Sequence, residues 1–399
     1  MATQTRHQQQ PKARDVVIVS AVRTPLCRAR KGALAKVPPS TLLSTALSGC
    51  LDKVKDGVSP ADVQDICIGN CLAPASGNAS MRMAQLSASI PSSVPLHTTN
   101  RQCSSGLQAV ANIANAIQVG SIDIGIGGGV ESMSTHPMNK IPMPDVDWSI
   151  MKESPTAAMD CLIPMGITSE NVAEKYNLTR TQLDTFAAQS HTKAARARDL
   201  NLFHDEIVPV GDVRHDDGIR PDTTVQSLAK LKAVFDPEHG STTAGNSSQL
   251  TDGAAAILLM TRAEANKRNL PILGVWRSFS VVGVPPHIMG IGPAVAIPAA
   301  LQQASLTIED IDVFEINEAF ASQAAWCVEE LGISGERVNP YGGAIALGHP
   351  LGATGARQIA TLLHGMGRSG GRFGVVSMCV GTGMGAAAVL EVEPSFSRL

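Results

Sequence analysis

The stretch that determines the fold is Asn100-Arg101-Gln102-Cys103-Ser104-Ser105-Gly106-Leu107-Gln108-Ala109. After the cysteine, apolar residues recur at helical spacing, at Leu107, Val110, Ile113 and Ile117. Cys103 is therefore expected at a helix N-terminus, where unpaired N–H groups and the helix dipole favour a negative charge. A thiol in that setting ionises more easily and becomes a nucleophile. The alternative is a small buried cysteine that only closes the end of a helix.

The C-terminal third of the chain repeats the plan of this region. Residues 65–70 predict a strand that ends in Asn70, and Cys103 follows Asn70 by 33 residues. Residues 312–317 predict another strand, and His349 follows its last residue, Asn317, by 32 residues. After each of these residues come a glycine at the same offset, a predicted helix and a strand that runs into glycines. The sequence thus predicts two duplicated α/β units that present Cys103 and His349 at equivalent strand-to-helix turns, where ligands commonly bind. Chance α/β patterning is the alternative.

This arrangement suggests covalent catalysis. Cys103 needs a base, and His349 at the equivalent turn is the obvious candidate. The glycines around His349 and after Cys379 let backbone amides approach a substrate and stabilise a developing oxyanion. Cys379 is the last residue of a predicted buried strand, residues 373–379, and is either a core residue or an acid/base at a carbon centre.

Composition excludes several classes of protein. With 399 residues, the chain is long enough for two or three domains, and 44% hydrophobic residues allow large cores. A net charge of −3 gives no electrostatic case for nucleic acid or an anionic membrane surface. The longest apolar run, residues 254–260, is too short for a membrane span. The eight cysteines form no CxxC pair, which favours reduced thiols in an intracellular protein.

The two ends and the middle of the chain differ from these units. Residues 1–13 are polar and Gln-rich, and we expect a disordered tail. The chain ends in Ser397-Arg398-Leu399, a conservative variant of the Ser-Lys-Leu peroxisomal address. Residues 133–243 are rich in Pro, Met and charge, with helical patterns over 169–176 and 180–198. This segment is expected to form an inserted lid or substrate-binding domain.

Four long motifs in this order resemble those of the thiolase family. They are residues 100–109, Asn317-Glu318-Ala319-Phe320, residues 342–350 and residues 377–385, and the resemblance runs from about residue 15 to residue 392. Residues 160–166 and 284–290 are similar to the peroxisomal 3-ketoacyl-CoA thiolases in particular. The resemblance implies a thiolase fold: two α/β halves in a five-layer αβαβα core with an inserted loop domain. The expected boundaries are 14–132 plus 244–271 for the first half, 133–243 for the loop domain, 272–393 for the second half and 394–399 for the C-terminal tail.

The resemblance also implies roles for the catalytic residues. Cys103 would attack the 3-keto carbon of a 3-ketoacyl-CoA and carry the acyl group as a thioester. His349 would activate Cys103, and Cys379 would protonate the departing acetyl-CoA carbanion. Asn317 would hold a water that completes one oxyanion hole, while the N–H groups of Cys103 and Gly381 form the other. The thiol of CoA then releases the shortened acyl group, so that CoA is a substrate and no metal or redox cofactor is needed.

The same resemblance implies a substrate site and partners. Arg220, Ser227 and Ser248 match family positions that contact CoA, although Arg220 could equally be a solvated surface arginine. Substrate contacts are also expected from the apolar residues Met165, Phe235, Met289 and Phe320. The expected partners are acyl-CoA, CoA, a second copy of the chain and a peroxisomal import receptor that reads the C-terminal tripeptide.

Two features depart from the usual pattern, and three rival functions remain. Residues 210–215 are shorter than the hairpin usual in peroxisomal relatives, and many relatives carry an N-terminal targeting signal instead. The first rival is a biosynthetic acetoacetyl-CoA thiolase. The second is a β-ketoacyl synthase, which shares the fold but lacks a second catalytic cysteine. The third is a non-catalytic acyl-CoA or lipid carrier, which the presence of Cys103, His349 and Cys379 disfavours.

Overall fold

A computed structural model describes residues 12–393 and residue 396. Most of the predicted N-terminal tail and the tripeptide Ser397-Arg398-Leu399 lie outside these residues. Within them, no helix has the length and apolar character needed to cross a membrane. All eight cysteines are free thiols, as the sequence predicts.

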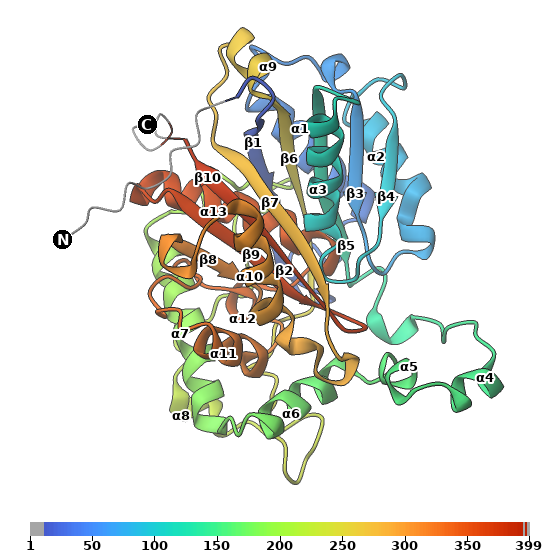
Figure 1. Ribbon diagram of the computed structural model, residues 1–399, viewed down its shortest axis with the longest axis vertical. Helices are drawn as coiled ribbons and strands as arrows, with labels where there is room; N and C mark the ends of the chain where they lie inside the picture. Colours follow the sequence, from blue (N-terminus) through green and yellow to red (C-terminus); the bar gives the residue numbers. More distant parts are fainter. Residues whose placement is uncertain (1–11, 394–395, 397–399) are drawn as a thin grey trace.

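The strands form one mixed sheet with two parts of related topology (Figure 1). The first part has the order β4 (Leu96–Thr99), β3 (Asp65–Gly69), β5 (Ile124–Ser132), β6 (Thr251–Thr261), β1 (Val16–Arg23). The second part continues with β7 (Gly274–Gly283), β10 (Met384–Val392), β9 (Phe373–Val380), β8 (Val313–Ile316). The short β2 (Cys27–Arg28) pairs with β6.

The pairing directions confirm the predicted duplication. β3 is parallel to β5, which is followed by antiparallel β6 and β1. In the same way β8 is parallel to β9, which is followed by antiparallel β10 and β7. Among the described residues, the strands of the two parts pair only where Val17 and Ile18 of β1 face Val275 and Gly274 of β7. Because only these two residue pairs connect the two parts, each part forms its own sheet layer.

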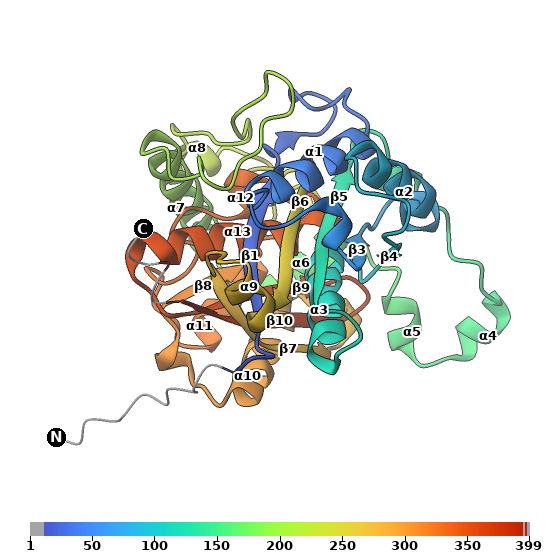
Figure 2. The ribbon, with the colours of Figure 1, turned by 90° about the horizontal axis from the view of Figure 1, so that it is seen from above.

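Helices cover both parts and fill the space between them (Figures 1 and 2). α1 (Pro39–Asp52) and α2 (Asn78–Ser87) pack on the outer face of the first part. α3 (Ser105–Val119) and α13 (Leu351–Ser369) share one core with the inner faces of both parts. α10 (Gly292–Ala304) and α11 (Ala321–Glu330) cover the outer face of the second part. The layers are helix, sheet, helix, sheet, helix, and the predicted α/β fold class is confirmed.

Glycines bring the two central helices unusually close. A Cβ on Gly106 of α3 would lie 2.5 Å from the carbonyl oxygen of Gly352 in α13. A Cβ on Gly355 would lie equally close to the backbone nitrogen of Leu107. These contacts leave no room for any side chain. Gly106 and Gly352 are the matching glycines of the repeat, and each follows its candidate catalytic residue, Cys103 or His349, by three positions. Because these glycines are in contact, the turns that contain Cys103 and His349 lie next to each other.

The inserted segment, residues 133–243, consists of helices joined by long loops. It contains α4 (Trp148–Glu153), α5 (Thr156–Asp160), α6 (Met165–Lys175), α7 (Arg180–Asp199), α8 (Val225–Leu228). The predicted helical pieces correspond to α6 and α7, and α6 begins four residues earlier than predicted, directly after Pro164. α4 and α5 form an arm that projects from the body (Figures 1 and 2). Two further short helices are α9 (Arg262–Lys267) and α12 (Ala344–Leu347).

Candidate active site

Cys103 lies in a tight turn between β4 and α3, two residues before the helix begins. The N–H groups of Ser104 and Ser105 donate to the carbonyl oxygens of Arg101 and Gln102 at 2.9 and 3.1 Å. Gln102 has a φ of 48°, an uncommon conformation for a residue with a side chain. A strained conformation of this kind persists where the surrounding hydrogen bonds enforce it. Here the conformation of Gln102 places the thiol of Cys103 at the N-terminal end of the helix.

Two backbone amides face the thiol of Cys103. The sequence predicts a thiol that ionises more easily, but burial instead raises the pKa of this thiol to about 11, and hydrogen bonds from the N–H groups of Gly381 and of Cys103 itself only partly counteract the rise. Donors that stabilise a thiolate also suit an oxyanion at the same place. These are the two amides that the resemblance assigns to one oxyanion hole.

His349 is held at both ring nitrogens. Its Nδ1 lies 2.7 Å from Oγ1 of Thr354, and its Nε2 lies 3.3 Å from Nδ2 of Asn317. Its backbone N–H donates to Oγ1 of Thr251 at 3.1 Å. Burial, and then the positive charge of Arg357, lower the pKa of His349 to about 3. The imidazole is therefore neutral near pH 7 and retains a lone pair for a proton.

Asn317 follows β8, as predicted, and its amide lies against His349. Its Oδ1 is buried without a partner among the described residues. A buried acceptor without a partner is costly unless water or a ligand fills its place. This oxygen therefore suits the water that the resemblance places here.

Cys379 lies near the end of β9 and is fully buried. Burial, and then the neighbouring Cys103, raise its pKa well above the usual value of a thiol. Cys379 is therefore a neutral thiol that holds a proton, and its ionisation is coupled to that of Cys103.

Apolar residues from four separate segments surround Cys379. Met289 and Ala319 form a buried cluster with it, and Met165 and Phe320 pack against this cluster. Phe235 contacts Phe320 edge to face, with ring centroids 6.4 Å apart. The structure thus brings Met165, Met289 and Phe320 beside the second thiol, and Phe235 joins this group through Phe320.

Of the three predicted CoA contacts, Arg220 and Ser248 lie on loops and Ser227 lies in α8. Ser248 is partly buried, and its N–H donates to the carbonyl oxygen of Ala319 at 2.9 Å. Arg220 is exposed, and its backbone N–H donates to Nδ1 of His191 at 3.2 Å. Ser227 is also exposed, but its hydroxyl caps α8 by accepting from the backbone N–H of Thr224 at 3.0 Å, and it donates to the carbonyl oxygen of Thr224 at 2.8 Å. Ser248 thus adjoins the apolar cluster, whereas Ser227 already has a local structural role.

Two residues near the site were not predicted from the sequence. Thr354 contacts His349, and Glu131 accepts a hydrogen bond from the backbone N–H of Gly352 at 3.0 Å. The only signal for Glu131 is a charged residue inside an otherwise apolar, glycine-rich strand. Thr354 lies five residues after His349, and this spacing alone does not predict a contact between them. The contact depends on the turn at Pro350, which the sequence does not specify.

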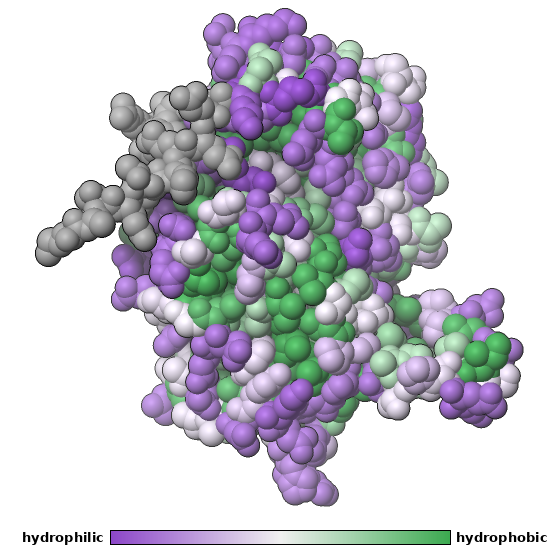
Figure 3. Space-filling view, in the orientation of Figure 1, coloured by the Kyte–Doolittle hydropathy of each residue, from purple (hydrophilic) through white to green (hydrophobic). Residues whose placement is uncertain are grey.

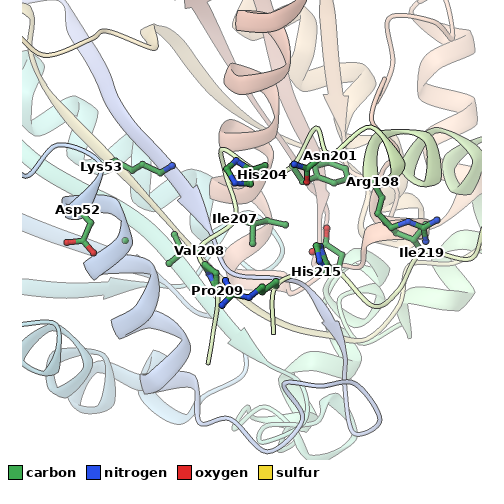
Figure 4. Close-up of a pocket in the computed structure, with 14 residues that line it drawn as sticks. Asp52, Lys53, Arg198, Asn201, His204, Ile207, Val208, Pro209, His215 and Ile219 are labelled. Carbon is green, nitrogen blue, oxygen red and sulfur yellow. The ribbon is translucent and has the colours of Figure 1, made fainter. Parts of the chain in front are cut away.

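A cavity of about 570 Å³ lies elsewhere on the molecule (Figure 4). It is formed by the ends of α1 and α7 and by residues 203–219, and its wall includes Lys53, His204 and His215. None of the predicted site residues lines this cavity. Ile219, which precedes Arg220 in the chain, does line it. The chemistry therefore belongs to the turns around Cys103 rather than to this cavity.

Comparison with known proteins supports the resemblance to the thiolase family that the sequence motifs show. The thiolase N-terminal domain model matches residues 16–263, and the thiolase C-terminal domain model matches residues 270–392. The chain is 56% identical to the peroxisomal 3-ketoacyl-CoA thiolase of Homo sapiens over 396 residues, which cover 96% of this chain and 92% of that protein.

Solved structures agree with the fold. The crystal structure of the dimeric peroxisomal thiolase of Saccharomyces cerevisiae matches with a TM-score of 0.90 and 46% identity, covering 96% of this chain and 99% of that one. The human mitochondrial 3-ketoacyl-CoA thiolase in complex with CoA matches with a TM-score of 0.85 and 34% identity, covering 96% and 100%. From both the duplicated architecture and these matches, the chain belongs to the thiolase family.

Proposed function

We propose that this protein cleaves 3-ketoacyl-CoA with CoA, giving acetyl-CoA and an acyl-CoA shortened by two carbons. The observation that carries the proposal is the coupled pair of thiols. Cys103 lies under two backbone N–H groups, and Cys379 is a buried, protonated thiol whose pKa is raised in part by Cys103. One thiol is suited to attack a carbonyl carbon and the other to move a proton at the neighbouring carbon.

In the first half-reaction, Cys103 transfers its proton to His349 and its sulfur bonds to C3 of the substrate. The N–H groups of Cys103 and Gly381 stabilise a negatively charged oxygen, and Asn317 with His349 provides a second polar site. The C2–C3 bond then breaks. The electron pair left on C2 takes the proton of Cys379, and acetyl-CoA leaves.

In the second half-reaction, the thiol of CoA gives its proton to the Cys379 thiolate. Its sulfur attacks the acyl thioester on Cys103, and the shortened acyl-CoA leaves. His349 returns its proton, so both cysteines regain their starting state. The protein supplies every proton carrier, and CoA is consumed as a substrate.

Arg220 and Ser248 would hold the CoA moiety, while Met165, Phe235, Met289 and Phe320 would line the acyl pocket. The clustering of these apolar side chains around Cys379 supports the second assignment. Ser227 is a weaker candidate for a CoA contact because its hydroxyl already caps α8.

We further propose a homodimer located in peroxisomes. The dimeric yeast relative supports the assembly, as do the exposed apolar residue Ile150 on the projecting arm and the exposed Ile141 and Met143 that precede the arm in the chain. Figure 3 shows apolar surface on this arm. The peroxisomal relatives and Ser397-Arg398-Leu399 support the location. Light scattering should give twice the mass of the chain, and deletion of the tripeptide should leave a tagged protein in the cytosol. A monomer, or unchanged import, would contradict the respective proposal.

A thiolysis assay tests the function. Purified protein with CoA should cleave 3-ketoacyl-CoA substrates of short, medium and long chain, with the loss of substrate matched by acetyl-CoA formed. Condensation of acetyl-CoA with no cleavage of longer substrates would instead favour the biosynthetic alternative.

A further inference from the structure

Glu131 is a buried carboxylate in the strand β5 with an unusual set of partners. Oε1 accepts from Nδ2 of Asn70 and from the N–H of Leu72, both at 3.2 Å. Oε2 accepts from the N–H of Cys71 at 2.9 Å and from the N–H of Gly352 at 3.0 Å. The residue is fully buried. Four donors thus face two oxygens, which matches a carboxylate and leaves no acceptor for a carboxyl proton.

The four donors come from both halves of the molecule. Residues 70–72 form the turn after β3 in the first half. Gly352 belongs to the first turn of α13 in the second half and follows His349 by three residues. One side chain therefore ties the segment that carries the base to the half that carries the nucleophile.

The turn at residues 70–72 is also linked to the nucleophile. The thiol of Cys71 donates to Oε1 of Gln102 at 3.4 Å, and Nδ2 of Asn100 donates to the carbonyl oxygen of Cys71 at 3.1 Å. Gln102 is the residue with positive φ that directly precedes Cys103. A movement of this turn would reach Cys103 through two hydrogen bonds.

Retaining a charge here is costly for the fold. Burial raises the pKa of Glu131 to about 7, although its four hydrogen bonds act in the opposite direction. Removing an acceptor that buried N–H groups use leaves those donors without a partner, which is costly. An amide of the same size does this, because its NH₂ group faces N–H donors that need an acceptor.

We propose that Glu131 is a positioning residue that fixes the turn of Cys103 relative to the turn of His349. This inference rests on the proposed function, in which Cys103 is the nucleophile. Glu131 acts through the N–H groups of Cys71, Leu72 and Gly352 rather than on the substrate. Displacements of about 1 Å in such a pair can slow a reaction about a hundredfold.

The test uses Glu131→Gln and Glu131→Asp in the full-length protein. Acyl transfer from acetyl-CoA to Cys103 is followed in a single turnover by mass spectrometry, and steady-state thiolysis gives kcat and KM. We expect both variants to lose about tenfold to a hundredfold in acyl transfer and kcat. The KM for CoA should change less than about threefold, because the hydrogen-bond partners of Glu131 lie at residues 70–72 and 352 and do not include the residues proposed to hold CoA.

Alkylation of Cys103 by iodoacetamide separates charge from geometry. The charge of Glu131 contributes to the raised pKa of the Cys103 thiol, so Glu131→Gln should move the pH profile of alkylation to lower pH. Glu131→Asp keeps the charge but is shorter, so it should lose acyl transfer with little change in this profile. In Glu131→Gln we therefore expect the Cys103 thiol to ionise at lower pH and yet to accept acyl groups more slowly. A variant that is merely less stable would not show this combination.

Asp252 supplies the matched control. It is a buried carboxylate opposite Ser132 on the neighbouring strand β6, and it accepts from Ser132 at the end of β5 and from Ser134 just after it, with no hydrogen bond to the second half among the described residues. Asp252→Asn should lower the melting temperature but leave acyl transfer by the folded protein unchanged.

Three outcomes would overturn the inference. They are wild-type acyl transfer in folded Glu131→Gln, wild-type acyl transfer in folded Glu131→Asp, and an equal loss in Asp252→Asn. If the wild-type protein itself forms no acyl-Cys103, the proposed function is wrong, and the inference about Glu131 fails with it.

Discussion

At the scale of single residues, the site depends on the orientation of His349. Its Nδ1 lies 2.7 Å from the hydroxyl of Thr354, and Asn317 lies at its Nε2. The partner of one ring nitrogen determines which tautomer is present, and therefore which nitrogen can exchange a proton with a substrate or thiol.

Replacement of Thr354 tests this orientation. Thr354→Val keeps the volume but removes the hydroxyl, so we expect kcat to fall about tenfold, corresponding to about 1.4 kcal/mol for one hydrogen bond. Thr354→Ser retains the hydroxyl and should retain most of the activity. Steady-state kinetics of both variants make the measurement, and equal activity in the two would show that the hydroxyl does not matter.

A second prediction at this scale concerns Arg220. If its side chain holds CoA rather than the acyl chain, Arg220→Ala should weaken binding of CoA and of all acyl-CoAs by about the same factor, of order tenfold. Calorimetric titration with CoA and with short and long acyl-CoAs would measure it. Effects confined to long chains would place Arg220 in the acyl pocket instead.

At the scale of elements, the contact between α3 and α13 aligns the two halves. A Cβ on Gly355 would meet the backbone of Leu107 at 2.5 Å, and backbone cannot move aside as a flexible side chain can. Gly355→Ala should therefore lower the free energy of unfolding by about 1–3 kcal/mol through overpacking.

Gly335 provides the control for this prediction, because nothing lies within 4 Å of a Cβ at that position. Gly335→Ala should change stability by less than about 0.5 kcal/mol. Urea denaturation of the two variants makes the comparison, and equal stability would show that the helices can separate without cost.

The elements also show how far the sequence could predict the structure. The strands before Asn70 and Asn317 and the helices after Cys103 and His349 were predictable, because their apolar patterns and glycines are local signals. β6 was visible only as the apolar run 254–260: both its faces are buried, so alternation is absent and a short apolar run does not distinguish strand from helix.

The candidate site was predictable to a similar extent. The repeat placed Cys103 and His349 at equivalent turns, and the family motifs supplied Asn317, Cys379 and Gly381. Glu131 could not be found in this way, because its partner Gly352 lies 221 residues away. Its role becomes visible only when both halves are packed together.

At the scale of the whole molecule, buried histidines predict a dependence of stability on pH. Burial, with a smaller contribution from Arg220, lowers the pKa of His191 from 6.5 to about 4. The unfolded chain therefore binds a proton at His191 below about pH 6.5, whereas the folded chain does not until about pH 4. The stability contributed by neutral His191 is complete above pH 6.5 and is lost as the pH falls toward 4.

His191→Gln should remove this contribution. Between pH 6.5 and 4, the free energy of unfolding of the wild type should fall more steeply than that of the variant, by up to about 1.4 kcal/mol per pH unit. Urea denaturation of both proteins across this range measures the difference in slope. Parallel curves would mean that His191 is protonated equally in the folded and unfolded chains.

The central claim is that the two thiols have different tasks. Cys103 forms the covalent bond, so Cys103→Ala should abolish acyl-enzyme formation as well as turnover. Cys379 only moves a proton at carbon, so Cys379→Ser should lose cleavage and condensation yet still accept an acyl group from acetyl-CoA. Overall rates cannot distinguish the variants, because removing one member of a group that acts as a unit costs almost as much as removing all.

Mass spectrometry of the peptides after incubation with acetyl-CoA tests this claim most directly. The account predicts an acetyl group on the peptide that contains Cys103 in the wild type and in Cys379→Ser, and none in Cys103→Ala. An acetyl group on Cys379, or no labelling of folded Cys379→Ser, would contradict it.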